Sequence, residues 1–451
     1  MAQNAASNLD YGTVQQAMKI HYKSLRVKDM VYKDNPLLAM LPKYESFGGL
    51  NMPIPIIYSN PQRAGATFGN AQSITSTSRV EQFIIERKKD YSFASVDGET
   101  IKASQGDTNA FLRYLTLEID GALHTLNRRL AIALYGDGTG RVGVLTGAGL
   151  PAGPGAVAPA PTPAIAAQTV TLSSASDITN FEVGMFVQLL DTGAVPQALI
   201  ARNSGAIPGV LPAVLDAFVI TKVDRDLGTI ELDDSAPNGV AVVASPTVIP
   251  YGDYTAGVGG AASSTKVFGL DAWLPNGGAA ARAAALLAPF NGVIRDVDST
   301  RLGGIVFDGT AMPIEEALIS AASRAAREGA RPDTCFVDFE TFSTLEKALG
   351  AKVLYTQAKA RDVDMGFHAM HVQGPRGLIS IVPDQNCPAN TAYMLQMDTW
   401  SLNSLGSAPH ILDLDGSRML REAAFDAYEV RCGYYANLAC NAPGWNVRVA
   451  L

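Results

Sequence analysis

Few residues of the chain have the type and spacing that a metal or catalytic site needs. His368 and His371 lie three residues apart and could share a metal ion on a helix, but no third ligand follows at a fixed spacing. With five histidines among 451 residues, coincidence explains this pair better than a metal centre does. Asp413 and Asp415 resemble part of a calcium loop, yet the remaining oxygen ligands are missing and a β-turn explains them better.

Motifs for covalent or phosphate chemistry are also missing from the sequence. There is neither a phosphate-binding loop ending in Gly-Lys-Ser/Thr nor a Gly-x-Ser-x-Gly nucleophile turn. The glycine-rich run 136–140 follows a predicted helix instead of opening one, which argues against dinucleotide binding. Cys335 lies in an apolar predicted strand, which favours a buried and inert thiol. The sequence therefore predicts no enzyme, no cofactor and no metal site.

Composition is that of a folded protein with an unusually small charged fraction. Hydrophobic residues make up 47% and charged residues 17% of the 451, enough for a large core divided into two or three domains. So little charge suggests that partners cover much of the surface. The net charge of -8 and the pI near 5.2 argue against a protein that grips nucleic acid by its phosphates.

The number of cysteines and the length of the apolar runs indicate in which cellular compartment the protein folds. Four cysteines without a Cys-x-x-Cys pair are too sparse for a disulfide scaffold, so folding in a reducing cytoplasm is expected; they are Cys335, Cys387, Cys432 and Cys440. Whether Cys432 and Cys440 pair later stays open at this point. The first residues lack the order of a signal peptide, and no apolar run approaches the 18 residues of a membrane span.

Residues 107–136 are the stretch that must hold the rest of the chain in position. Leucine and isoleucine recur at steps of three and four, which is the α-helical period: Leu112, Leu115, Ile119, Leu123, Leu126, Leu130 and Leu134. Asp107 offers capping chemistry at the start and Gly136 a stop. A helix of roughly 28 residues would be about 42 Å long. The alternative is a long core helix of an α/β enzyme.

Two arms precede this helix. Residues 1–50 form a polar arm with one short apolar run at 37–41, and we expect this arm to lie across another surface. Residues 52–58 and 80–96 predict two strands joined by a polar tip at 59–78. An isolated two-stranded ribbon is marginal in water, so we expect it to lie on a neighbouring subunit. The alternative is a hairpin folded onto its own domain.

Composition changes abruptly after the helix. A linker rich in Gly, Ala and Pro at 143–168 leads into short β-like segments between 169 and 251, which predict a small inserted β-domain. An α/β unit follows, with a helix opened by Pro313. Its other predicted elements are a helix at 339–349 and strands at 334–338, 377–383 and 392–398, before C-terminal strands at 418–430, 432–438 and 446–451.

The order of these parts resembles the major capsid protein of tailed double-stranded DNA bacteriophages, which has the Hong Kong 97-like fold. Residues 395–416 and 426–451 are also similar to the ends of many phage coat proteins. The resemblance covers 1–141 and 265–451, and it rests on the order of all the parts because no single motif is diagnostic. It implies an α+β fold with an N-arm, an E-loop, a long spine helix, and peripheral and axial domains.

The resemblance implies a division of the chain. The expected parts are the N-terminal arm at 1–50, the E-loop and start of the peripheral domain at 51–100, the spine helix at 101–141, an inserted β-rich domain at 142–264, the axial domain at 265–400, and C-terminal peripheral-domain strands at 401–451. The insert departs from the minimal pattern of the family and is expected to face outward or to extend the axial domain.

The resemblance also implies a function. The chain would be a structural head protein that self-assembles, as hexamers and pentamers, into an icosahedral shell around packaged DNA without sequence-specific binding. It would be made in the host cytoplasm and reside in the virion, with no membrane association. A shell of an encapsulin-like nanocompartment is the main alternative, and a multidomain hydrolase is a further one.

Six apolar residues of the hairpin arm are expected to become buried only on assembly: Ile54, Ile56, Ile57, Phe68, Phe83 and Ile85. Together with Leu37 and Leu38 of the N-terminal arm, they are the residues expected to contact neighbouring subunits. The tip at 59–78 contains no Lys, so the lysine–asparagine cross-links of the type member are not expected. The N-arm is too short for a fused scaffolding domain. A separate scaffolding protein or an already processed start is therefore expected, together with a portal and, optionally, a decoration protein.

Overall fold

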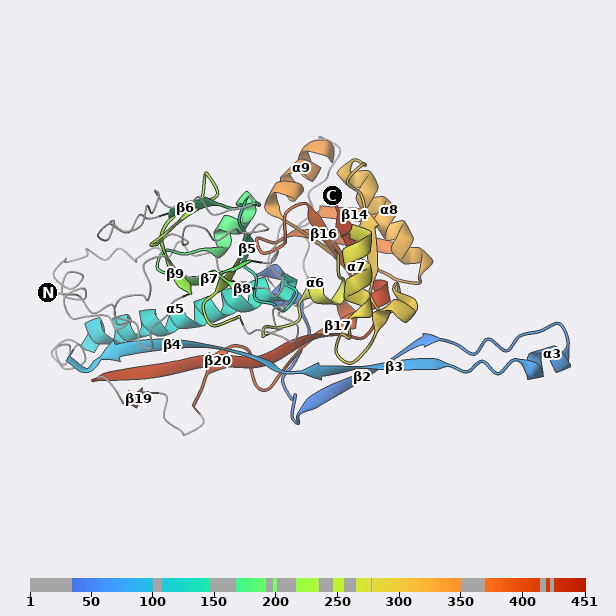
Figure 1. Ribbon diagram of the computed structural model, residues 1–451, viewed down its shortest axis with the longest axis horizontal. Helices are drawn as coiled ribbons and strands as arrows, with labels where there is room; N and C mark the ends of the chain where they lie inside the picture. Colours follow the sequence, from blue (N-terminus) through green and yellow to red (C-terminus); the bar gives the residue numbers. More distant parts are fainter. Residues whose placement is uncertain are drawn as a thin grey trace, which may run out of the picture.

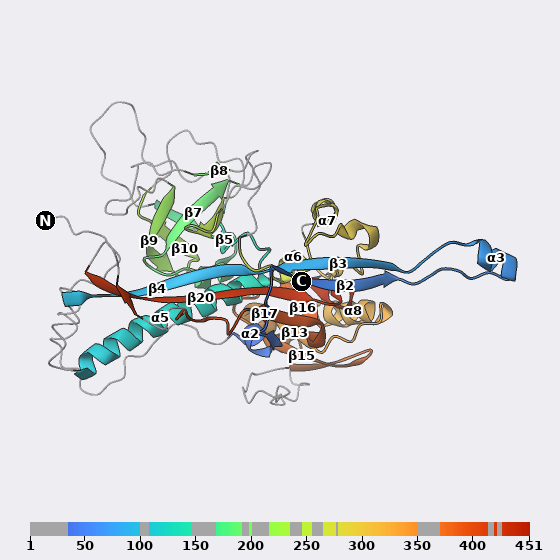
Figure 2. The ribbon, with the colours of Figure 1, turned by 90° about the horizontal axis from the view of Figure 1, so that it is seen from below.

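The chain combines three β-sheets and one long hairpin with a 28-residue helix, α5 (Thr108–Tyr135) (Figure 1). The computed structural model describes residues 35–99, 108–146, 168–191, 198–200, 216–234, 246–254, 265–276, 278–349, 370–413, 419–421 and 426–451. Figures 1 and 2 show an elongated molecule in which the hairpin projects from one end of the body. The α+β class predicted from the sequence is confirmed.

Helix α5 matches the helix predicted at 107–136 to within one residue at each end. Its leucine stripe explains the position of the helix, because Leu126, Leu130 and Leu134 are completely buried in the main core. The helix packs against β4 (Lys88–Asp97) and β20 (Ala427–Cys440), which pair antiparallel along ten residues. The same sheet contains β1 (Lys43–Tyr44), β17 (Trp400–Ser404), β18 (His410–Ile411) and β19 (Leu420–Arg421).

A second six-stranded sheet has the order β12-β21-β16-β13-β15-β14. Its strands are β12 (Ile305–Asp308), β13 (Thr334–Val337), β14 (Met370–Gly374), β15 (Gly377–Pro383), β16 (Thr391–Leu395) and β21 (Val447–Ala450), and α8 (Ile314–Arg327) and α9 (Phe339–Leu349) pack with it around a separate apolar cluster. The C-terminus is tied into a sheet, as predicted. However, β21 lies here and not beside β20, so residues 401–451 are shared between two sheets instead of supplying peripheral-domain strands only.

A third sheet forms within residues 143–250 and has its own apolar core, which includes Phe181, Val187 and Phe218. Its strands are β5 (Gly143–Val144), β6 (Gln168–Thr171), β7 (Phe186–Asp191), β8 (Ala198–Leu199), β9 (Ala217–Asp224), β10 (Thr229–Leu232) and β11 (Thr247–Pro250), with the 3-10 helix η2 at Ala175–Asn180. The short β-like segments predicted between 169 and 251 are therefore confirmed as strands. We call this unit the β-domain; Figure 1 shows it beside α5, on the side away from β20.

The described part of the N-terminal arm lies on the body of its own chain. Helix α2 (Pro36–Met40) buries Leu37 and Leu38 in the main core, and β1 pairs with β17 in parallel. Leu37 and Leu38, which were predicted to contact neighbouring subunits, are thus buried within their own subunit. The remaining short elements are α6 (Leu270–Trp273), α7 (Gly278–Leu287), η4 (Arg295–Asp298), η6 (Met397–Thr399) and η7 (Pro443–Trp445).

The β-domain contains one carboxyl group that makes its stability depend on pH. Burial raises the pKa of Asp177 to about 6, although the positive charge of Arg141 partly opposes the shift. A raised carboxyl pKa in the folded state contributes stability at low pH, and this contribution is lost as the pH rises through the folded pKa. Asp177→Asn is therefore expected to be as stable as the native chain near pH 4. At pH 8 the variant should unfold at a higher temperature, because its free energy of unfolding is larger by up to about 3 kcal/mol.

Thermal unfolding followed by circular dichroism across this pH range measures the difference. Asp226→Asn, at an exposed turn of the same domain, is the matched control and should show no such pH-dependent gain. An equal stability of the Asp177→Asn variant and the native chain at pH 8 would contradict the expectation.

Candidate assembly surface and charged junction

The hairpin of β2 (Asn51–Ser59) and β3 (Arg79–Glu86) carries a short helix, α3 (Phe68–Ser73), at its tip. Figure 1 shows α3 far beyond the body of the subunit. Local bonds hold the tip in shape: the Thr67 hydroxyl accepts a hydrogen bond from the Asn70 amide at 3.3 Å, and Arg63 Nε donates to the Ser76 carbonyl at 2.8 Å. The tip is thus an ordered projection whose conformation the chain itself supplies.

The base of the hairpin packs on its own subunit. Phe83, fully buried, lies against Trp273 and Phe290 with ring centroids 5.2 and 6.3 Å apart, and Ile54 and Ile85 are buried in the same core. The expectation that these three residues become buried only on assembly is wrong, because the chain covers them without a neighbour. The hypothesis of a hairpin folded onto its own domain is thus correct for the base and not for the tip.

Farther out along the hairpin, apolar side chains lie exposed. Ile57 is 66% exposed and is paired across the strands with Val80, which is also exposed; Phe68 on α3 is 84% exposed, and Ile56 is half-buried. Their role as contacts to neighbouring subunits stays a prediction. Val80 was not among the contact residues predicted from the sequence. Its position in the second predicted strand, opposite Ile57, could have indicated it.

Two further exposed aromatic residues, Tyr91 and Phe93, were not predicted as contacts. They lie on β4, with Phe93 60% exposed, and Tyr91 meets Tyr435 of β20 edge to face at 6.1 Å. Asp90, which immediately precedes Tyr91 on the strand, lies on the opposite face and is buried. In its first half, strand β4 therefore has an acidic group inside and aromatic rings outside, which reverses the usual alternation, whereas Ala94 and Val96 farther along are buried in the usual way.

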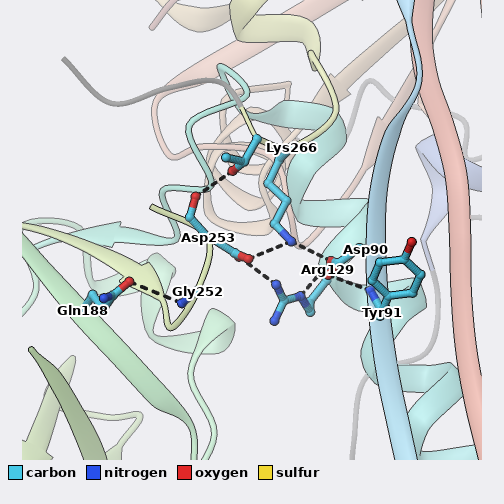
Figure 3. Close-up of polar contacts among 8 residues, drawn as sticks. Asp90, Tyr91, Arg129, Gln188, Gly252, Asp253 and Lys266 are labelled. Carbon is cyan, nitrogen blue, oxygen red and sulfur yellow. Dashed lines mark hydrogen bonds and ion pairs between the residues drawn. The ribbon is translucent and has the colours of Figure 1, made fainter. Parts of the chain in front are cut away.

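The inward position of Asp90 is explained by a cluster of four charges, three of them buried and Arg129 partly exposed, which we call the junction (Figure 3). Arg129 of α5 donates from Nε to Asp90 Oδ2 at 2.9 Å and from Nη2 to Asp253 Oδ2 at 2.7 Å. Lys266 Nζ lies 2.9 Å from Asp90 Oδ2 and 2.9 Å from Asp253 Oδ1. Each carboxylate is thus held by both cations, and the four charges sum to zero.

Each member of the junction belongs to a different segment. Asp90 is on β4 and Arg129 on the long helix, whereas Asp253 follows the last strand of the β-domain and Lys266 precedes α6. The Gly252 amide next to Asp253 donates to Gln188 Oε1 of β7 at 3.3 Å, which continues the polar contacts into the β-domain sheet (Figure 3). The junction therefore ties the β-domain to the helix and to the sheet beneath it.

The electrostatics follow from burial and mutual attraction. Burial lowers the pKa of Arg129, but the charges of Asp90 and Asp253 more than offset this, so the pKa is raised. Burial raises the pKa of Asp253, against the opposing charges of Arg129 and Lys266. Tyr434 of β20 packs nearby, and burial, with Asp90 as the next cause, raises its pKa. Arg129 is consequently a fixed cation, whereas Asp253 is the member that protonates more readily.

The residues considered for metal or redox chemistry do not form a site. His371 lies on β14 with Nδ1 3.2 Å from the Ser380 hydroxyl, and His368 and Asp415 lie outside the described residues. In the described ranges, no group of three or more His, Cys, Asp or Glu residues could hold a metal ion. No helix there is long and apolar enough to cross a membrane.

The cysteines are buried thiols. Burial raises the pKa of Cys335 to about 12, in keeping with the inert thiol predicted from the sequence. Cys432 and Cys440 lie eight residues apart on the same strand, which places them roughly 26 Å from each other at about 3.3 Å per residue. They therefore cannot form a disulfide with each other within one chain.

Comparison with known proteins shows which families and solved structures this chain is similar to. Residues 252–416 match the family described as SU10 major capsid protein. No curated protein matches the chain. Among solved structures, the chain is similar to the cyanophage A-1(L) capsid asymmetric unit, at 11% identity and a TM-score of 0.51 over 94% of this chain and 96% of that one.

Two further structures are similar at lower scores. The capsid of an empty GTA particle is 8% identical with a TM-score of 0.43, covering 97% of this chain and 96% of that one. A chain of Mycobacterium phage Bobi is 10% identical with a TM-score of 0.40, covering 98% of each.

The similarity to the cyanophage capsid chain shows the fold, which is the Hong Kong 97-like fold of phage capsid proteins. The fold and the family match over residues 252–416 both agree with the resemblance that the order of parts in the sequence indicated.

Proposed function

We propose that the chain forms the hexamers and pentamers of an icosahedral shell that encloses packaged double-stranded DNA. The observation that carries this proposal is the hairpin, whose base is anchored in the core and whose tip projects with Phe68 exposed. An ordered arm with exposed apolar side chains gains burial only against another molecule. The hairpin is therefore the element that grips a neighbouring subunit.

A shell built from one chain repeats the same contacts many times. A projecting hairpin on one subunit and a different receiving surface on the next make a heterologous contact, which closes into rings of subunits. Ile57, Phe68 and Val80 would be covered in such a ring. In the body that carries them, the junction connects α5 and β4 to the β-domain.

The acidic character of the chain agrees with enclosing DNA without gripping it. With a net charge of -8, the subunit does not offer the excess of Lys and Arg that sequence-independent phosphate binding uses.

We also propose assembly in the host cytoplasm with a separate scaffolding protein and a portal. The β-domain, whose described strands stand beside the helix, offers a place for a decoration protein. The chain would carry out no catalysis. None of the matches described above points to the alternative of an encapsulin-like compartment.

Electron microscopy of the purified full-length protein tests the proposal directly. The expected result is closed icosahedral shells or ring-shaped capsomers, which elute near the void volume in size-exclusion chromatography. Shells isolated from infected cells should contain double-stranded DNA. A monomer or small oligomer at every concentration and salt condition would refute the proposal, whereas DNA-free shells that enclose an enzyme would favour the nanocompartment.

A further inference from the structure

A cleft of about 390 Å³ opens beside α6 and α7 and has mixed walls. Its apolar lining includes Phe268, Pro275, Pro289 and Phe290, and its charged lining consists of Asp137, Arg141, Asp271 and Arg295. This volume lies in the lower part of the range of small-molecule sites, which are mainly apolar with a few polar groups. The cleft is separate from the hairpin tip and from the junction.

Arg295 is the most unusual residue of the cleft. Its side chain is only 3% exposed and stacks on Phe290 with the guanidinium carbon 4.2 Å from the ring centroid. Nη1 donates to the carbonyls of Ala272 and Trp273 at 2.9 and 3.2 Å, and Nη2 donates to that of Ala285 at 3.4 Å. Nε is buried without a hydrogen-bond acceptor among the residues that the structure describes. Main-chain carbonyls thus satisfy part of the group, but no carboxylate among the described residues forms an ion pair with it.

A second arginine increases this imbalance. Arg282 of α7 donates to the carbonyls of Pro275, Ser299 and Gly304 at 2.7, 3.2 and 2.7 Å. Within the described part of the chain, neither Arg282 nor Arg295 forms an ion pair with a carboxylate. Burial and the neighbouring charge of Arg282 lower the pKa of Arg295 to about 10. A buried charge is costly unless it is paired, so an anion at this position would stabilise the folded chain.

The carboxylates on the walls are already engaged. Asp271 pairs with Arg448, and Asp137 accepts hydrogen bonds from the Thr139 amide and hydroxyl at 2.9 and 2.5 Å. Arg141 at the rim is 47% exposed and lies 3.9 Å from Asp271, so its guanidinium has donors left for a ligand. Two arginines, Arg141 and Arg295, and two aspartates line the cleft. Arg448 already pairs with Asp271 and the charge of Arg282 lies close to Arg295, so the positive groups in and next to the cleft outnumber the carboxylates.

We propose that this cleft binds a small ligand with one carboxylate attached to an apolar group. The carboxylate would lie between Arg141 at the rim and the guanidinium of Arg295 below, where it would balance the excess charge. The apolar part would pack against Phe268 and the two prolines. A charge-assisted hydrogen bond and the burial of apolar surface would together stabilise the bound ligand.

Titration calorimetry with unassembled full-length subunits tests this proposal, using benzoate as the probe and benzamide as its uncharged analogue. Benzoate is expected to bind and to raise the thermal unfolding midpoint, and benzamide should bind at least about tenfold more weakly because it lacks the charge. Inorganic phosphate, which has no apolar part, should also bind more weakly than benzoate.

Two variants connect binding to the cleft. Arg141→Gln changes an exposed residue and should weaken benzoate binding by about tenfold while leaving the fold intact. Arg295→Met should abolish it, and circular dichroism reports whether that variant folds. Lys222→Gln, an exposed cation on β9, is the matched control and should bind as the native chain does. Unchanged affinity in Arg141→Gln, equal binding of benzoate and benzamide, or phosphate binding as tight as benzoate would overturn the proposal.

Discussion

Arg129→Met is expected to lower the free energy of unfolding by about 3–5 kcal/mol, the range for removing one partner of a buried ion pair. The change leaves Asp90 and Asp253 with Lys266 as their single cation, so the junction carries a net negative charge in a place that water reaches poorly. Chemical denaturation of the unassembled subunit measures the loss. Because the junction joins the β-domain to α5, the variant should also assemble into less regular shells.

The adjacent residue supplies the matched control. Arg128 lies on the same helix and pairs with Glu182 at 2.5 Å, but Glu182 is about half exposed. Exposed ion pairs contribute roughly 0–1 kcal/mol, so Arg128→Met should cost little. Equal losses in the two variants would show that the junction contributes no more than a surface ion pair.

A second substitution tests whether charge balance is the cause. Adding Asp253→Asn to Arg129→Met leaves one pair, Asp90 with Lys266, and should restore part of the stability. Lowering the pH should have a similar effect on the single variant, because burial raises the pKa of Asp253 and its protonation removes the excess negative charge. A double variant that is less stable than Arg129→Met would contradict this account.

Local patterns predicted helix α5 and most strands because their causes lie within a few residues. The leucine stripe at Leu126, Leu130 and Leu134 determines one buried face at any position in the fold. Strand β4 shows where such reasoning fails. Asp90 is inside and Phe93 outside because Arg129, Asp253 and Lys266 surround Asp90, and the nearest of these is 39 residues away. No local period contains that information.

The sheet that receives the last strand depends on distant partners as well. Strand β21 was correctly predicted as a strand, but the choice between β20 and the pair β12 and β16 is made by packing across the whole chain. The same holds for the hairpin, whose apolar alternation cannot show that Trp273 covers Phe83 while Phe68 is left exposed. The sequence therefore predicts which residues are apolar strand residues, and tertiary contacts determine which of them remain available to a neighbour.

Phe68→Asp is expected to abolish shell formation while leaving the stability of the subunit within about 0.5 kcal/mol, because the side chain is 84% exposed in the free chain. A charge at the centre of an apolar contact costs at least about 2 kcal/mol per contact, and a shell repeats that contact at every subunit. Size-exclusion chromatography and electron microscopy should show subunits or small rings where the native chain forms shells. Ile57→Asp should act in the same direction.

Phe83→Ala on the same hairpin should show the opposite pattern, which makes it the decisive comparison. This ring is buried against Trp273 and Phe290, so its removal should cost about 3–5 kcal/mol of subunit stability. The amount of shells should then fall only in proportion to the fraction of subunits that are unfolded. If Phe68→Asp formed normal shells, the tip would not be a subunit contact, and the gripping role of the hairpin would fail even though the capsid fold itself would stand.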